Sequence, residues 1–156
     1  MDTLTLLQPG KRYPLPVVLI DRPGDGYWSG WRGFMEDQLA SAGYIGPVDG
    51  AFFHHAHAVD DAVAFINGFY RRFHSLRFVG GKSVIRMATS LSESDVDRLQ
   101  EEFADILMEG GGLRRSGPLP KECDEPELAH LPRLVVDFNK RDFARLRQLI
   151  DAINRL

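Results

Sequence analysis

The residues best suited to chemistry lie in a loop that follows a short apolar run. This loop, residues 21–30, reads Asp-Arg-Pro-Gly-Asp-Gly-Tyr-Trp-Ser-Gly and joins an expected strand to an expected helix. Ligands of open α/β sheets bind at the carboxyl ends of strands, in loops at this position. We therefore expect the loop to line a small-molecule crevice through four residues, Asp25, Gly26, Tyr27 and Trp28. The alternative is that its glycines serve only a turn and a helix start.

The glycine spacing of this loop argues against a nicotinamide cofactor. Gly24, Gly26 and Gly30 follow the pattern G-x-G-x-x-x-G, which is one residue longer than the dinucleotide fingerprint. Asp25 lies inside the loop, where its carboxylate would repel a phosphate. The lysines show no recognisable pyridoxal-phosphate site either. We therefore expect no cofactor.

Three histidines, His54, His55 and His57, are close enough in the sequence to suggest a metal site. In an extended segment His55 and His57 share one face, whereas His54 points to the opposite face. Catalytic zinc usually has three protein ligands, and no third ligand is evident in the sequence. We interpret these histidines as ordinary surface or crevice residues and expect no metal.

Other reactive or charged side chains favour ordinary roles. Cys123 has acidic neighbours that oppose thiolate formation, so it is a poor nucleophile. His74 adjoins Ser75, but adjacent residues rarely reach each other in the geometry of a catalytic triad. The arginines at 71, 72 and 77 favour solvation of a helix end over binding of an anion. The basic residues of the last expected helix likewise favour a solvated face over a nucleic-acid stripe.

Alternating strands and helices must position the loop. Residues 16–21 form an apolar run between prolines and glycines, which is typical of a parallel strand buried on both faces. Apolar residues then recur every three or four positions from Trp28 to Ala42, which predicts an amphipathic helix. Residues 51–59 are an extended candidate, and Asp60 can cap the next helix. The expected apolar face of that helix is Val63, Ile66, Phe69, Tyr70 and Phe73.

The pattern changes after residue 75. Two strands are expected around the turn Gly80-Gly81, and Ser92 with Asp95 resembles a capping box that starts a helix. The remaining expected elements are a strand at 113–120, an acidic surface loop at 121–132, a strand at 134–138 and a final helix capped by Asn139 and Asp142. Apolar residues at helical spacing predict the core faces of the two helices, which are Val96, Leu99, Phe103, Ile106 and Leu107 in the first and Phe143, Leu146, Ile150 and Ile153 in the last. Residues 76–156 therefore predict a small α+β unit of the order ββαββα, attached to an α/β layer in residues 1–75.

Composition excludes several classes of protein. The chain has 156 residues, of which 44% are hydrophobic and 26% charged, as in an ordinary folded domain. Acidic residues number 22 and basic residues 19, so no basic field marks a partner of nucleic acid or of an anionic membrane. The single cysteine excludes an internal disulfide, and no segment resembles a signal peptide or a membrane span. We expect a cytoplasmic protein.

Several segments resemble the LOG (Lonely Guy) family, Rossmann-like proteins formerly labelled "possible lysine decarboxylase". The matching segments are Leu4-Thr5-Leu6-Leu7-Gln8-Pro9-Gly10-Lys11, Leu15 to Asp21, Gly26-Tyr27-Trp28, Phe69-Tyr70 with His74-Ser75 and Arg77, Pro132-Arg133-Leu134, and Leu146 to Asp151. Members of the family include nucleoside 5′-monophosphate phosphoribohydrolases, which hydrolyse the N-glycosidic bond. The resemblance implies that residues 1–75 are the C-terminal half of a Rossmann-like parallel sheet layer and residues 76–156 a bacterial C-terminal extension.

The family's catalytic motif, P-G-G-x-G-T-x-x-E, does not occur in this chain, and its active-site arginine and lysine have no counterpart here. The motif precedes the helix end that residues 1–8 resemble, and Asp2 does not replace the motif glutamate. The resemblance therefore implies a truncated reading frame, a split gene or a chosen segment, inactive by itself.

Two functions follow from this resemblance. The chain is either part of an enzyme that binds a nucleoside 5′-monophosphate, or a non-catalytic nucleotide-binding, dimerisation or regulatory module. Because the first strand would lack neighbours, we expect the chain to expose apolar surface and to form a homodimer or a higher homo-oligomer.

Overall fold

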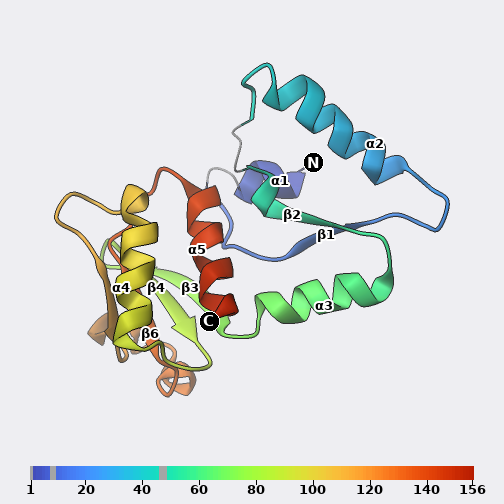
Figure 1. The fold of residues 1–156 in the computed structure, drawn as a ribbon. Helices are drawn as coiled ribbons and strands as arrows, with labels where there is room; N and C mark the ends of the chain where they lie inside the picture. Colours follow the sequence, from blue (N-terminus) through green and yellow to red (C-terminus); the bar gives the residue numbers. More distant parts are fainter. Residues whose placement is uncertain (1, 8–9, 46–48) are drawn as a thin grey trace.

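The parallel and antiparallel strands separate into two sheets (Figure 1). The computed structural model describes residues 2–7, 10–45 and 49–156. In these residues a parallel pair, β1 (Val17–Ile20) and β2 (Phe53–Ala56), precedes an antiparallel sheet of order β3-β4-β6-β5. The strands of this second sheet are β3 (Phe73–Val79), β4 (Lys82–Met87), β5 (Leu113–Ser116) and β6 (Arg133–Val136). The mixed α/β class predicted from the sequence is confirmed.

The parallel pair has helices on both of its faces. A helix, α2 (Tyr27–Phe34), continues as a π-helix over Met35–Ala40 and leads through a 3-10 turn at Asp49–Phe52 to β2. Trp31 of α2 contacts Phe53 of β2 with ring centroids 5.3 Å apart. The next residue, His54, stacks at 4.4 Å on Phe65 of α3 (Val59–Phe69). Because successive strand residues point to opposite faces, α2 and α3 cover opposite faces of β2.

The expected burial of the first strand is wrong. β1 pairs with β2 in parallel, as predicted, with Val17 opposite Phe53 and Ile20 opposite Ala56. However, its first three residues are only half-buried, and Ile20 is 41% exposed. Among the described residues β1 has one neighbouring strand, and a strand at a sheet edge shields less of its surface than a central strand does.

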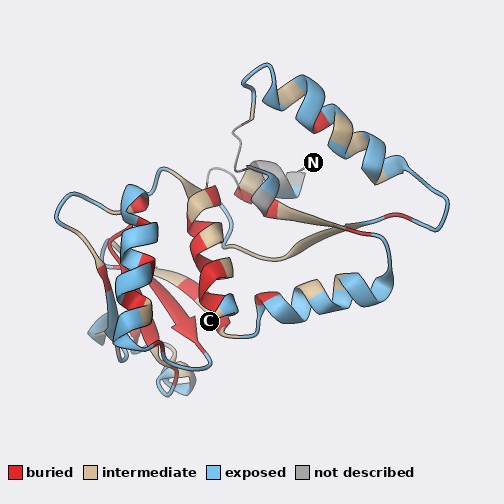
Figure 2. Ribbon diagram, viewed as in Figure 1, coloured by how far each residue is buried: buried red, intermediate tan, exposed pale blue. Residues whose placement is uncertain are grey.

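The second predicted helix also differs from its expected form. The N-cap of α3 is Ala58 rather than Asp60, which lies in the first turn. Of its expected apolar face, Phe69 is buried, but Val63, Ile66 and Tyr70 are exposed. Most of the helix is coloured as exposed in Figure 2. Phe73 belongs to β3 instead of the helix. The helix therefore turns a different side to the core from the one that periodicity indicated.

The antiparallel unit follows the predicted order ββαββα. Gly80 and Gly81 have φ angles of 55° and 86° in the β3–β4 hairpin, a left-handed conformation that glycine adopts without strain. Ser92 and Asp95 form the predicted capping box of α4 (Glu93–Glu102), which a 3-10 turn at Ala104–Ile106 follows. Asp142 caps α5 (Phe143–Arg155) by accepting the N–H of Arg145.

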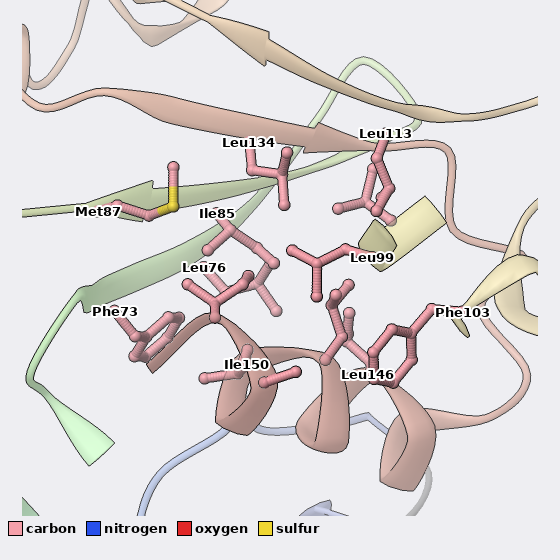
Figure 3. Packing of buried hydrophobic residues seen from close by; sticks show 14 of the residues in the cluster. Phe73, Leu76, Ile85, Met87, Leu99, Phe103, Leu113, Leu134, Leu146 and Ile150 are labelled. Carbon is pink, nitrogen blue, oxygen red and sulfur yellow. The ribbon is translucent and has the colours of Figure 1, made fainter. Parts of the chain in front are cut away.

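The main core lies between this sheet and its two helices. Figure 3 shows Leu76, Ile85 and Leu134 of the sheet packed against α4 and α5. Leu99 comes from α4 and Phe103 from its C-cap, and Leu146 and Ile150 come from α5. These side chains are at most 4% exposed, so the apolar periodicity predicted for both helices is confirmed as core.

The acidic segment is not the solvated surface loop that the sequence predicts. It forms 3-10 turns at Pro120–Glu122 and Pro126–Leu128. Its Glu122 is buried and binds Arg86 of β4 at 2.7 Å and Arg133 of β6 at 3.4 Å. Arg77, expected to solvate a helix end, lies on β3 and binds Asp124 at 2.6 Å. Ion pairs therefore hold this acidic segment against the sheet.

The last helix, α5, packs against the antiparallel sheet and also contacts segments next to the parallel pair. Phe143 and Ala144 of α5 pack with Phe52 and with Leu7 of the short helix α1 (Asp2–Leu7). Arg147, expected on a solvated face, is buried, and its Nη1 donates to the carbonyl of Leu15 at 3.0 Å. The helix end that residues 1–8 resemble is present as α1, and Met1 and Gln8 lie outside the described residues. None of the described helices is long and apolar enough to cross a membrane.

Candidate functional site

The carboxyl ends of β1 and β2 bring a carboxylate and an imidazole together. Asp21 directly follows β1, and the parallel register places Leu19 beside His55. Asp21 Oδ2 lies 2.8 Å from His55 Nε2, and the two side chains are 5% and 4% exposed. A buried carboxylate in direct contact with a histidine is a recurring arrangement of functional sites.

Asp21 also fixes the start of α2. Its carboxylate accepts the N–H groups of Trp28 at 2.9 Å and Ser29 at 3.2 Å, together with the Ser29 hydroxyl at 3.1 Å. Gly26 holds the N-cap position and has no side chain that could cap the helix. Asp21 therefore satisfies first-turn amides that would otherwise lack partners, from a position outside the helix.

The charge of Asp21 is stabilised by these donors. The N–H of Trp28 contributes most to lowering the pKa of Asp21, and His55 and Ser29 lower it further, against the opposing effect of burial. Asp21 is therefore ionised at neutral pH. A negative charge at this place also interacts favourably with the dipole of α2.

The bond to Asp21 orients His55. With the Nε2–H donating to the carboxylate, the neutral ring keeps an unprotonated Nδ1 that can accept a proton or a hydrogen bond. His57 lies on the same side, with ring centroids 4.5 Å apart, whereas His54 points the other way and contacts Asp61 at 3.1 Å. The predicted division of the histidines between two faces is confirmed.

The four predicted crevice residues lie in the same loop as Asp21. Asp25, Gly26 and Tyr27 are exposed, and Asp25 accepts the N–H of Tyr27 at 3.3 Å. Trp28 is half-buried and packs edge-on against Tyr27 and Trp31 at 4.9 and 5.9 Å. The loop that follows Asp21 therefore presents aromatic rings and the exposed carboxylate of Asp25.

A Cβ atom added at Gly24 or Gly26 would meet nothing within 4 Å. The space next to the backbone at these two glycines is therefore open. Gly24 has a φ of 81°, so the turn itself requires a residue that tolerates the left-handed region.

Other reactive side chains do not join this site. His74 Nδ1 lies 3.0 Å from Ser75 Oγ on β3, so the side chains of these adjacent residues are in contact. No carboxylate contact to His74 is seen in the described residues, and a triad needs one to orient the base. Cys123 is exposed. Across residues 2–7, 10–45 and 49–156, no three His, Cys, Asp or Glu side chains form a group that could hold a metal ion.

Sequence reasoning missed the Asp21–His55 pair, although it considered both segments. The residues are 34 positions apart and form no motif. The signal available was an aspartate at the end of one strand and a histidine in the next, which parallel pairing would bring to one edge. Comparisons with family models, with curated proteins and with solved structures find no match for this chain.

Proposed function

We propose that this chain is a nucleotide-binding module whose loop, residues 21–28, forms one wall of a site for a nucleoside 5′-monophosphate. The observation that supports this most directly is the Asp21–His55 contact at 2.8 Å, which joins two strand ends to the start of α2. It holds an exposed aromatic loop at the edge where α/β sheets bind ligands. The ligand class comes from the resemblance to the LOG family.

The parallel pair supports a Rossmann-like layer as part of this proposal. β1, α2 and β2 form a strand–helix–strand unit with parallel strands, and α3 covers the opposite face. Both strands are mostly half-buried, whereas parallel sheets are usually covered on both faces by a larger layer. Further strands from another polypeptide segment would complete such a layer.

The loop is suited to contacts with a base or a ribose rather than with a phosphate. Tyr27 and Trp28 offer aromatic faces for stacking. Phosphates in Rossmann folds bind the free amides at a helix N-terminus, but Asp21 already occupies the amides of Trp28 and Ser29. The negative charges of Asp21 and Asp25 also oppose a phosphate. The phosphate must therefore be held by groups outside this loop.

The same geometry explains why we propose no catalysis by the chain alone. Hydrolysis of an N-glycosidic bond requires a preorganised carboxylate near the developing ribosyl cation. Both oxygens of Asp21 accept hydrogen bonds from Trp28, Ser29 and His55. Asp25 is exposed and not preorganised in this way. We therefore propose that the chain forms a wall of the binding site and does not provide the catalytic carboxylate.

Titration with AMP, GMP, CMP and UMP tests this function. Trp28 and Trp31 are the tryptophans of the chain, and their fluorescence should change saturably with a Kd on the order of 1 mM, as expected for a partial site. Tyr27→Ala should weaken binding, whereas Tyr44→Ala, at another exposed tyrosine, should leave it unchanged. No saturable change with any of the four nucleotides, or equal binding by both variants, would refute the proposal.

Chromatography of the same mixtures tests the absence of catalysis. We expect no free base from any nucleotide. Base release that Asp25→Ala abolishes would show that the loop carries a catalytic carboxylate. The proposal that the chain binds the nucleotide without catalysing its hydrolysis would then be wrong.

A second candidate function is assembly, in which the chain serves as a dimerisation module. The observation that favours it is the exposed apolar side of α3, which no described residue covers.

A further inference from the structure

One side of α3 and its C-cap carries four large apolar side chains in solvent. Val59, Val63, Ile66 and Tyr70 are 67%, 49%, 39% and 48% exposed. Their spacing places them on one side of the helix. Figure 2 shows most residues of α3 as exposed. A contiguous apolar surface of this kind on a folded chain indicates an interaction site. We refer to these four residues as the α3 stripe.

We propose that the α3 stripe is the interface between two copies of this chain, packed with their α3 helices antiparallel. The intervals between stripe residues are four, three and four, so the spacing reads the same from either end. In an antiparallel pair Val59 meets Tyr70 of the second copy and Val63 meets Ile66. Each contact then occurs twice, as a two-fold interface requires.

The charges at the two ends of the α3 stripe favour a second copy of this chain as the partner, and they favour the antiparallel direction. Asp60 lies beside the first stripe residue, and Arg71 directly follows the last one. Neither side chain has an ion pair among the described residues. Antiparallel packing brings Asp60 of each copy toward Arg71 of the other, and the helix dipoles oppose each other favourably. Parallel packing would bring like charges together.

A second arginine, Arg155, lies at the Arg71 end. A hollow of about 400 Å³ between α3 and α5 is lined by both arginines and by Asp151, with Phe65 and Phe69 as apolar walls. Phe65 and Phe69 lie on the inner side of α3, against His54 and Arg147. The stripe is thus a separate side of the helix that the fold leaves free. This inference does not depend on nucleotide binding, because the stripe and the loop, residues 21–28, share no residue.

Sedimentation of the full chain tests the dimer. A stripe of four side chains buries less than the roughly 800 Å² per partner of a standard interface, so we expect a reversible monomer–dimer equilibrium at roughly 100 µM chain. Ile66→Glu should raise the dimer Kd about tenfold or more, because it places a charge at the centre of the interface. Met108→Glu is the control, since Met108 is an exposed apolar side chain outside the α3 stripe, with 48% exposure against 39% for Ile66. It should leave the Kd unchanged.

Charge reversal tests the direction of packing. Arg71→Asp should weaken the dimer, and the double variant Asp60→Arg with Arg71→Asp should restore it, because the pair is then reversed rather than broken. A purely apolar association would respond to neither change. Circular dichroism of each variant confirms that α3 remains folded.

Disulfide trapping gives a second readout that does not depend on affinity. In a Cys123→Ser background, Val59→Cys and Tyr70→Cys stand about 16 Å apart along the helix at about 1.5 Å per residue, whereas a disulfide needs Cα atoms within about 7 Å. A mixture of the two variants should therefore cross-link under oxidation, and neither variant should do so alone. A monomeric wild type at roughly 100 µM, an unchanged Kd for Ile66→Glu, or cross-linking of Val59→Cys with itself would overturn the proposal.

Discussion

Replacement of Glu122 by alanine should destabilise the fold strongly, although the residue lies in an acidic segment that resembles a surface loop. Its Oε1 accepts Arg86 Nε at 2.9 Å and Arg86 Nη2 at 2.7 Å. Its Oε2 accepts the N–H of Leu119 at 2.9 Å and Arg133 Nε at 3.4 Å. The side chains of Glu122, Arg86 and Arg133 are 1%, 3% and 1% exposed. Alanine would leave two buried guanidinium groups without the carboxylate that they share.

The magnitude follows from this burial. Removal of one partner of a buried ion pair costs about 3–5 kcal/mol when the remaining charge stays buried and unpaired. Glu122→Ala leaves Arg133 without this carboxylate, whereas Arg86 keeps its contact to Glu125 at 2.7 Å, so we expect a loss at the lower end of this range, about 3 kcal/mol. Folded domains have about 5–15 kcal/mol of stability in total. A chain of this size loses about 2–4 °C of Tm per kcal/mol, so the Tm of Glu122→Ala should fall by roughly 6–12 °C.

Urea unfolding and a thermal scan, followed by circular dichroism, measure the effect. Glu127→Ala is the control, since Glu127 is an exposed glutamate of the same acidic segment whose side chain makes no hydrogen bond or ion pair in the part of the chain that the structure describes. It should leave the unfolding free energy unchanged. A loss below about 1 kcal/mol for Glu122→Ala, typical of a solvent-screened pair, would refute the inference that this segment is held by a buried ionic network.

Three further outcomes are expected. The chain should lose stability below about pH 4.5, near the ordinary pKa of glutamate, because Arg77 lowers the pKa of Asp124 and Arg86 lowers that of Glu125. A carboxylate with a lowered pKa stabilises the fold above its unfolded pKa, and this contribution is lost as the pH falls. Urea midpoints measured across pH 3–7 would not change with pH if the contacts were absent. EDTA should leave the Tm unchanged, since the described residues hold no group of metal ligands; a fall in Tm that zinc reverses would show a structural metal. Asp21→Asn should weaken nucleotide binding by the loop, because the amide removes the charge that orients Trp28 and His55, whereas an unchanged titration would separate the Asp21–His55 pair from ligand binding.

Local features of this fold follow from residues that are near one another in the sequence. The capping box of Ser92 and Asp95 depends on positions three residues apart, and the turn at Gly80-Gly81 depends on two residues that accept positive φ. The core face of α5 follows from a period of 3.6 residues. Each of these was predicted correctly, because the interactions that determine them join residues only a few positions apart in the sequence.

Contacts between distant segments were decided only by the tertiary structure. Periodicity indicates which side chains of α3 share a face, but neighbouring elements determine which face is covered, and here they cover Phe69 and leave Ile66 exposed. Composition makes Glu122 appear solvated, yet arginines from two strands bury it. Asp21 meets His55 only because β1 and β2 pair in parallel. Burial and charge pairing depend on the sum of long-range contacts, which a local pattern does not contain.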